Sequence, residues 1–210
     1  MVASCNKVTC IMVQIILASA SPSRLRLLES VGITPKVLVS GVNEETSELD
    51  SLTPSELVIA LAILKAHTVK EIAPADSLII GCDSTFEFEG KSLGKPGSKE
   101  NAIARCKQLS GKSGYLHTGH CVIDLKNGIE LSERSTAKVQ FAQMTDAEIT
   151  DYVDSGEPLN VAGGFTLDGL SAPFITNIEG DPSGIIGLSL PLLRKMFISL
   201  GYSWPDLKNK

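Results

Sequence analysis

The amino-acid sequence predicts an α/β protein with a mixed β-sheet, and three observations support this fold class. Strand-type and helix-type segments alternate through the first half of the chain, as they do around a parallel sheet. Residues 77–82 form a continuous apolar run, which is typical of a strand covered on both faces. Residues 115–125 and 129–141 are two long strand-type segments separated by Asn127-Gly128, a strong signal for an antiparallel hairpin.

The individual elements are predicted from their start signals, their end signals and their apolar patterns. Serine or threonine before proline, or before a glutamate three residues on, marks helix starts, and glycine marks helix ends. Residues 41–51 form an acidic loop, and residues 163–187 are expected to be irregular with short strands. The expected strands cover 13–18, 36–40, 77–82, 85–88, 91–93, 115–125 and 129–141, and the expected helices cover 21–32, 53–72, 98–109, 145–155 and 188–200.

The composition excludes several classes of protein. The 210 residues include 19 Lys and Arg against 24 Asp and Glu, a net charge of −5, and 43% of them are hydrophobic. Such ordinary fractions exclude a disordered chain. Nucleic acid is not an expected partner, because it requires a basic face. A membrane is not expected either, because no apolar stretch approaches the roughly 18 residues of a span.

The N-terminal residues and the cysteines bear on location. Residues 1–12 are predicted to be an extension and residues 13–210 a single domain. Lys7, the apolar run over 11–17 and the following Ala18-Ser19-Ala20 superficially imitate a secretory signal, but the run is short, and we expect it to form the first strand. Five cysteines, with no C-x-x-C pair, indicate reduced thiols in an intracellular, cytoplasmic protein.

The segment after the first strand is a candidate anion site. Ser19 and Ser21 lie where the strand passes into a helix, and Arg24 follows in its first turn. Backbone N–H groups and the positive end of the helix dipole meet there, and an arginine adds a fork of donors. The alternative is a well-capped helix with a solvated arginine.

Two further positions carry candidate chemistry. Asp83 is expected just past the end of the 77–82 strand, where open α/β sheets place their ligands, and its carboxylate can hold Mg²⁺ or polarise water. The alternative is a turn aspartate. Lys95 lies between Gly94 and Pro96, which fix the local backbone and would allow a phosphate to approach closely. The alternative is an ordinary loop lysine. Lys65 borders the apolar stripe of its predicted helix and can extend into solvent or into a cleft.

Several common motifs are missing. Gly90-Lys91-Ser92 and Gly111-Lys112-Ser113 end like a phosphate-binding loop, but each lacks the earlier glycine. No G-x-G-x-x-G follows a strand and there is no G-x-S-x-G, so dinucleotide-binding and hydrolase-elbow folds are not supported. His117 and His120 are not expected to bind a metal.

In their order and spacing, several sequence motifs together resemble the Maf family of nucleotide pyrophosphatases. The resemblance covers residues Ile15 to Tyr202, nearly the whole chain. The segments that carry it are LASASPSRLRLL (17–28), GVNEE (41–45), LKA (64–66), GCDST (81–85), LGKP (93–96), LSGKSGYLHTG (109–119), AGGF (162–165) and GDPSGIIGLSLPLL (180–193).

This resemblance implies two α/β lobes around an elongated mixed sheet with a central cleft. It also implies hydrolysis of a nucleoside triphosphate to the monophosphate and pyrophosphate, with Mg²⁺ or Mn²⁺, by a homodimer that removes non-standard nucleotides. The positions that match the family's functional residues are Asp83, Lys65 and Lys95 for catalysis, Ser19, Ser21 and Arg24 for the substrate, and Glu44 with Asp83 for the metal. A nucleotide-binding regulator of cell division with little catalysis is the alternative.

The chain departs from the family at positions linked to base choice. Ser23 replaces a basic residue common before Arg24, and Asp168 replaces a glutamine that the pyrimidine-specific branch uses. An ionised aspartate only accepts hydrogen bonds, and guanine offers N–H donors. We therefore expect Asp168 to contact a purine or modified base, such as 7-methylguanine, rather than thymine or uracil. Deaminated purines are a further candidate class, and Asp168 as a turn residue is the alternative.

Overall fold

A computed structural model describes residues 13–44, 46–47 and 49–208. The predicted extension over residues 1–12 lies outside this part of the chain. Seven strands among the described residues form one mixed sheet, in the order β2-β1-β3-β5-β6-β7 with β4 paired to β3. The strands are β1 Gln14–Leu17, β2 Lys36–Val37, β3 Ser77–Phe88, β4 Lys91–Leu93, β5 Ser113–Asp124, β6 Ile129–Phe141 and β7 Ile175–Glu179. The predicted α/β class with a mixed sheet is confirmed.

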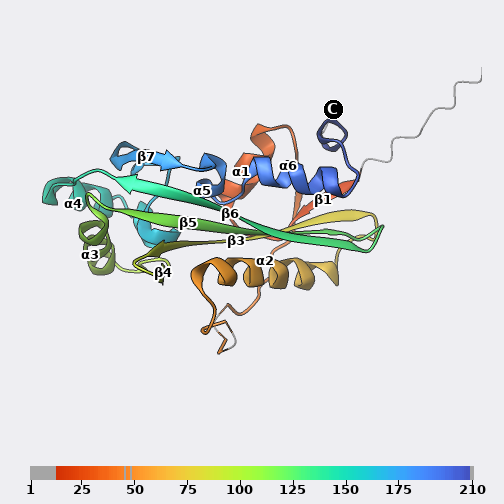
Figure 1. Ribbon diagram of the computed structural model, residues 1–210, viewed down its shortest axis with the longest axis horizontal. Helices are drawn as coiled ribbons and strands as arrows, with labels where there is room; N and C mark the ends of the chain where they lie inside the picture. Colours follow the sequence, from red (N-terminus) through yellow and green to blue (C-terminus); the bar gives the residue numbers. More distant parts are fainter. Residues whose placement is uncertain (1–12, 45, 48, 209–210) are drawn as a thin grey trace, which may run out of the picture.

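The helices cover both faces of the sheet, as Figure 1 shows. Helix α2 lies along one face, α1, α5 and α6 lie along the other, and α3 and α4 lie at the far end of the long strands. The helices are α1 Pro22–Ser30, α2 Pro54–Lys70, α3 Lys99–Leu109, α4 Asp146–Asp154, α5 Pro182–Ile186 and α6 Leu190–Ser199. In the part of the chain that is described, no helix combines the length and apolar character needed to cross a bilayer.

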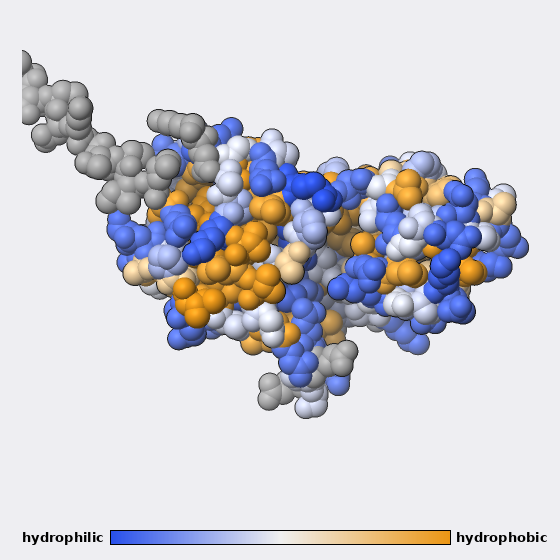
Figure 2. Space-filling model, turned by 180° about the vertical axis from the view of Figure 1, so that it is seen from behind, coloured by the Kyte–Doolittle hydropathy of each residue, from blue (hydrophilic) through white to orange (hydrophobic). Residues whose placement is uncertain are grey.

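The long strands β3, β5 and β6 run through two halves of the molecule, each with its own core. In the half that contains β1, apolar residues of the sheet pack against α6 on one face and α2 on the other. In the other half, Phe86, Phe141 and Phe165 meet edge to face with ring centroids 5.0–5.8 Å apart. Figure 2 shows a depression between these two halves. The arrangement matches the expected two lobes around an elongated sheet.

One edge of β3 is shared by two strands that do not meet. Strand β5 pairs with β3 from Leu78 to Glu87, so β1 and β4 must share the opposite edge. The register of β1 on β3 ends at Ile80, and β4 pairs with β3 only from Phe86 onward. The β3 residues between them have no neighbouring strand on that edge. The loops that leave β1 and β4 both start at this gap.

Asp83 lies inside a strand, which corrects the prediction that it follows one. Strand β3 continues unbroken to Phe88, because β5 supplies a partner along almost its whole length. The turn comes only at Glu89 and Gly90, both of which have positive φ angles. The apolar run over 77–82 marks the part of β3 that is covered on both faces, not the end of the strand.

The second strand and the final helix also differ from the predicted ones. The strand expected over 36–40 is limited to Lys36–Val37, since it pairs only with the last residues of β1. The final helix begins at Leu190 rather than at 188. Gly187, with φ of +127°, ends α5, and the Ser189 side chain then caps α6. The irregular segment over 163–187 therefore ends in a short helix.

Candidate functional site

A buried ion pair lies where the two halves of the molecule meet. The Lys65 ammonium of α2 donates to Asp83 Oδ1 at 2.6 Å, and it lies 2.8 Å from Glu44 Oε1 in the acidic loop. Lys65 and Asp83 are buried, whereas the Glu44 side chain is half exposed. Of the two placements the sequence left open for Lys65, the structure therefore has it extending toward Asp83, between two carboxylates.

Two glycines allow α2 to approach the sheet closely enough to form this pair. A Cβ atom at Gly81 would lie 2.2 Å from the Ala62 carbonyl oxygen, and one at Gly119 would lie 2.1 Å from the Val58 carbonyl oxygen. Any side chain at these positions would collide with helix backbone. Gly81 of the GCDST motif and Gly119 of the HTG motif thus set the distance between α2 and the sheet at Asp83.

The electrostatic environment of Asp83 combines opposing influences. Burial raises the pKa of the Asp83 carboxyl above its ordinary value, and the nearby Glu44 carboxylate adds to this effect. The Lys65 ammonium and the Arg24 guanidinium act against burial by favouring the charged form. The resulting raised pKa makes Asp83 a stronger base than a solvent-exposed aspartate, which suits a group that takes a proton from water.

Arg24 is buried and is held by neutral oxygen atoms. Its Nε donates to the Gly187 carbonyl at 2.7 Å, Nη1 donates to Ser19 Oγ at 2.9 Å, and Nη2 donates to Ser84 Oγ at 3.0 Å. The residue is only 8% exposed. Within the described ranges, no carboxylate forms an ion pair with it. A buried guanidinium whose charge is not neutralised by an acid is suited to bind an anion.

The two predicted serines have different structural roles. Ser21 is the N-cap of α1, and its Oγ accepts from the Arg24 backbone N–H. Ser19 accepts from the Ser21 backbone N–H and from the Arg24 side chain. The helix is therefore well capped, and the arginine is directed inward rather than solvated. The anion site at this segment stays a prediction.

Lys95 is exposed in the loop that leaves β4, and its backbone is anchored on both sides. Arg105 Nη1 donates to the Gly94 carbonyl at 3.3 Å, the Asn101 side chain donates to the Pro96 carbonyl at 3.1 Å, and the Gly97 N–H donates to a carbonyl at 3.1 Å. The loop starts where β4 ends, next to the β3 residues that have no neighbouring strand on that edge. Asp83 is one of these residues. The side chain is therefore not part of the buried cluster, although its loop starts beside it.

Asp168 forms an ion pair with Arg26 of α1, with Nη2 and Oδ2 3.5 Å apart. It lies in a loop of the other half that Glu157 holds by accepting from the Leu170 N–H at 3.0 Å. The Arg26–Asp168 pair thus links α1 to the loop of the other half at the surface. Asp168 lies outside the Lys65 cluster, in a bend directly before the turn that begins at Gly169. Its role as a base contact or as a turn residue stays open.

The predicted metal ligands are two carboxylates that share one lysine. A carboxylate has two oxygens, so Asp83 and Glu44 can each contact Lys65 through one and a divalent cation through the other. Mg²⁺ is commonly held by one or two carboxylates together with phosphate oxygens of the substrate. Among the described residues, no group of three or more His, Cys, Asp or Glu side chains forms a protein-only metal cage. The donor set therefore fits a cation that binds together with a phosphate ligand.

Sequence reasoning did not single out three residues that hold Arg24 in place: Ser84, Thr118 and Gly187. They lie in the GCDST, HTG and GIIG segments, which were noted only as parts of the resemblance. Ser84 could have been found from its position, because a hydroxyl side chain directly after Asp83 is a candidate to contact the same ligand. The fold brings Gly187 to Arg24, and Thr118 to Ser84, from positions far along the chain.

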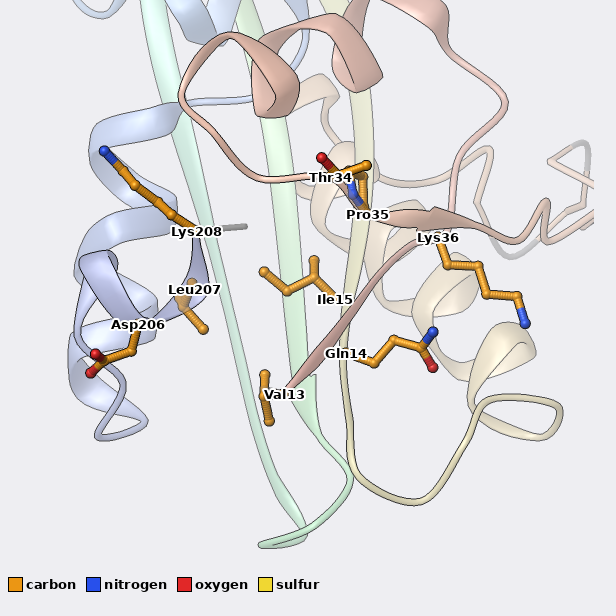
Figure 3. A pocket seen from close by; sticks show the side chains of 9 residues that line it. All are labelled: Val13, Gln14, Ile15, Thr34, Pro35, Lys36, Asp206, Leu207 and Lys208. Carbon is orange, nitrogen blue, oxygen red and sulfur yellow. The ribbon is translucent and has the colours of Figure 1, made fainter. Parts of the chain in front are cut away.

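A separate cavity lies away from these residues. It has a volume of about 460 Å³ and opens between the edge of the sheet at β1 and β2 and the C-terminal turn, as Figure 3 shows. Apolar Val13, Ile15 and Leu207 line its interior, and the ammonium groups of Lys36 and Lys208 lie toward its outer ends. None of the predicted site residues lines it.

The fold and site define an α/β protein of two halves. At their junction lie a buried aspartate–lysine pair and an arginine that forms no ion pair within the described part of the chain. The sequence profile of the family described as "Maf-like protein" matches residues 14–200. The chain therefore belongs to the Maf family, as the motifs indicated.

Curated relatives share about half of their residues with this chain. A protein of Streptomyces coelicolor is 51% identical over 195 residues, which cover 92% of this chain and 94% of the relative. A protein of Thermosynechococcus vestitus is 49% identical over 199 residues, 95% of this chain and all of the relative. One of Salinispora tropica is 47% identical over 191 residues, 89% of this chain and 84% of the relative. All three are named nucleoside triphosphate pyrophosphatase.

Proposed function

We propose that this protein hydrolyses nucleoside triphosphates to the monophosphate and pyrophosphate. The observation that carries this proposal is the arrangement of Asp83 and Lys65 beside Arg24, a buried base next to a cation that forms no ion pair with an acid of the described residues. Relatives that match this chain over most of its length are named for the same activity. A triphosphate carries about four negative charges near neutral pH, so its hydrolysis requires such cations to offset the repulsion of an attacking nucleophile.

In the proposed mechanism, three cations bind the phosphates and one carboxylate activates water. Arg24, Lys65 and Lys95 offset the charge of the phosphate chain. Asp83 orients a water molecule and accepts its proton. The water oxygen forms a bond to the α-phosphorus, and the bond between that phosphorus and the bridging oxygen breaks, so pyrophosphate leaves with the electron pair. Lys65 keeps the Asp83 carboxylate in position for this transfer.

Asp83 and Glu44 are the proposed ligands of a divalent cation, Mg²⁺ or Mn²⁺. A bound cation supplies further positive charge to the phosphate oxygens. Glu44 extends from the acidic loop, and its half-exposed side chain can reorient without disturbing the core. Addition of a chelator should abolish pyrophosphate release, and readdition of Mg²⁺ or Mn²⁺ should restore it.

Asp168 is the proposed contact for the base. Its carboxylate accepts hydrogen bonds, which suits the N1 and N2 donors of guanine and its 7-methyl derivative. It now pairs with Arg26, and both side chains are accessible to solvent. The pair can open at small cost, because exposed ion pairs contribute about 0–1 kcal/mol.

The remaining parts of the proposal concern assembly and location. We expect the protein to act as a homodimer in the cytoplasm. A cytoplasmic location agrees with the thiols of Cys82, Cys106 and Cys121, which are free in the described part of the chain. Sedimentation velocity on the full chain measures the oligomeric state, and a monomer at micromolar concentration would contradict a dimer.

Pyrophosphate release from a panel of nucleoside triphosphates tests the proposed function. The panel includes the standard ribo- and deoxyribonucleotides, 7-methyl-GTP, ITP and XTP, each with Mg²⁺ and with Mn²⁺. Fast release from at least one of them is expected, with guanine-like bases ahead of UTP and dTTP. Nucleotide binding without release from any member would instead favour a regulator of cell division with little catalysis.

A further inference from the structure

A chain of hydrogen bonds connects Arg24 to the backbone of α5 through two hydroxyl groups. Arg24 Nη2 donates to Ser84 Oγ at 3.0 Å, and Ser84 Oγ lies 2.8 Å from Thr118 Oγ1. Thr118 Oγ1 in turn donates to the Gly184 carbonyl at 2.8 Å. Thr118 is fully buried in β5. The chain thus begins at the proposed phosphate-binding arginine and ends in the interior.

Every donor in this chain has only one possible direction. A carbonyl oxygen only accepts, so the single proton of Thr118 must point to Gly184. The bond between the two hydroxyls must therefore use the Ser84 proton. An arginine N–H only donates, and Ser84 therefore presents a lone pair to Arg24. The donor and acceptor of every hydrogen bond in this series therefore follow from the Gly184 carbonyl at its end.

This direction matters for the orientation of the guanidinium. Arg24 has five N–H donors, and Gly187, Ser19 and Ser84 accept from three of them, one on each nitrogen. The three acceptors define the plane of the group, which leaves one N–H on each terminal nitrogen for a ligand. Without the Thr118 hydroxyl, the Ser84 proton loses its acceptor, and Ser84 is free to rotate away from Arg24 or to turn its proton toward the cation.

The same segment of the chain anchors both ends of the network. Gly187 accepts from Arg24 Nε, and Gly184, three residues earlier, accepts from Thr118. A Cβ atom at Gly187 would lie 3.3 Å from Arg24 Nε, and its φ of +127° disfavours other residues. The Asp181 side chain caps α5 by accepting from the Gly184 N–H at 3.0 Å, so the acceptor of Thr118 is itself fixed.

We propose that Thr118 is a positioning residue that orients Arg24 through Ser84 for binding of a polyphosphate. This role deepens the proposed function, because it rests on Arg24 as the ligand of the substrate's phosphates. Thr118 itself does not contact the ligand. It acts by holding the Ser84 lone pair toward the guanidinium.

Binding of inorganic tripolyphosphate, measured by calorimetry, tests this role without requiring turnover. Thr118→Val replaces the hydroxyl with a methyl group of similar size and should weaken binding by roughly tenfold to a hundredfold, as expected when a hydrogen bond to a charged group is lost. Thr118→Ser keeps the hydroxyl and should retain most of the affinity. Equal affinity of the Val and Ser variants would overturn the proposal.

A double-mutant cycle separates positioning from a general structural effect. In an Arg24→Lys background, where the fork of donors is missing, Thr118→Val should cause little further loss of affinity. An equal loss in both backgrounds would show that Thr118 does not act through Arg24. If the unaltered chain binds tripolyphosphate no better than Arg24→Lys, Arg24 is not a phosphate ligand and the proposal fails.

Two further measurements keep the result interpretable. Thermal unfolding of Thr85→Val gives the stability cost of losing another buried hydroxyl, one that bonds to Ser92 and is not part of the hydrogen-bond chain to Arg24. If Thr118→Val does not fold, Ser84→Ala removes the middle of the chain and should weaken binding to a similar extent. Nucleotide hydrolysis by the same proteins is scored separately. Its absence, with the binding pattern intact, refutes the proposed function but supports the role of Thr118.

Discussion

Asp83 lies directly opposite Gly119 in the β3–β5 pair, and the missing side chain of Gly119, with that of Gly81, lets α2 come close enough for Lys65 to lie 2.6 Å from the Asp83 carboxylate. The Val58 carbonyl of α2 occupies the space where a Cβ atom would stand. The ion pair therefore depends on a residue that has no functional group of its own.

Gly119→Ala should move α2 away from the sheet and separate Lys65 from Asp83. We expect a loss of about 1–3 kcal/mol in the free energy of unfolding, the range for overpacking a tight interface, together with a large loss of pyrophosphate release. Chemical denaturation and initial rates measure the two effects. Gly94→Ala, at a glycine with nothing within 4 Å of the new Cβ, is the control for stability. Equal stability of the two variants would contradict this account of the packing.

Asp83→Asn should lower the rate of pyrophosphate release by orders of magnitude while the protein stays folded. The amide has nearly the same shape as the carboxylate, but it cannot accept a proton from water. Asp154→Asn removes a carboxylate from an exposed ion pair with Lys99 and should leave the rate unchanged. A near-normal rate for Asp83→Asn, with circular dichroism matching the unaltered chain, would exclude Asp83 from the mechanism.

The buried His120 should make the protein less stable in mild acid. Burial lowers the pKa of this imidazole from 6.5 to about 4, and its Nε2 accepts from the Ser189 N–H, so the folded state holds it neutral. Between these values the unfolded chain binds the proton more readily, and stability falls as the pH falls through that window. The loss approaches about 3 kcal/mol at pH 4.

Denaturant unfolding between pH 7 and pH 4 measures this effect. His120→Gln should have a shallower decline, because it removes the titrating ring and keeps an acceptor for Ser189. His67→Gln, at an exposed histidine paired with Glu130, is the control for replacing a histidine at the surface. If His120→Gln declines as steeply as the unaltered protein, another group causes the acid sensitivity.

Asp168→Gln should shift base preference toward pyrimidines. A glutamine both donates and accepts, which suits the edge of uracil, whereas an aspartate only accepts. The ratio of kcat/KM for UTP to that for GTP should rise by roughly tenfold, the effect of about one hydrogen bond. Arg26→Ala is the control, since it breaks the same ion pair without changing the residue that faces the base. An equal shift in both variants would assign the effect to the ion pair instead.

Local sequence patterns determined most of the fold. Ser21, Ser98 and Thr145 cap helices where the sequence placed them, because their side chains satisfy N–H groups within a few residues. Asp83, Lys65 and Arg24 were predicted as site residues from their motifs. Lys65 and Asp83 are buried in contact with each other and Arg24 is buried as well, while Lys95 and Asp168 lie outside the buried cluster. That these residues form one site stays a prediction.

Only the tertiary structure decided how these residues are arranged. The continuation of β3 through Asp83 depends on pairing with β5, which begins 30 residues after Asp83. The support of Arg24 depends on Gly187, 163 residues away. Capping and periodicity act over one or two turns of chain and are therefore visible in the sequence. Strand pairing, close helix approach and hydrogen bonds between distant segments depend on which surfaces meet in the folded protein. Local sequence patterns do not specify these long-range contacts.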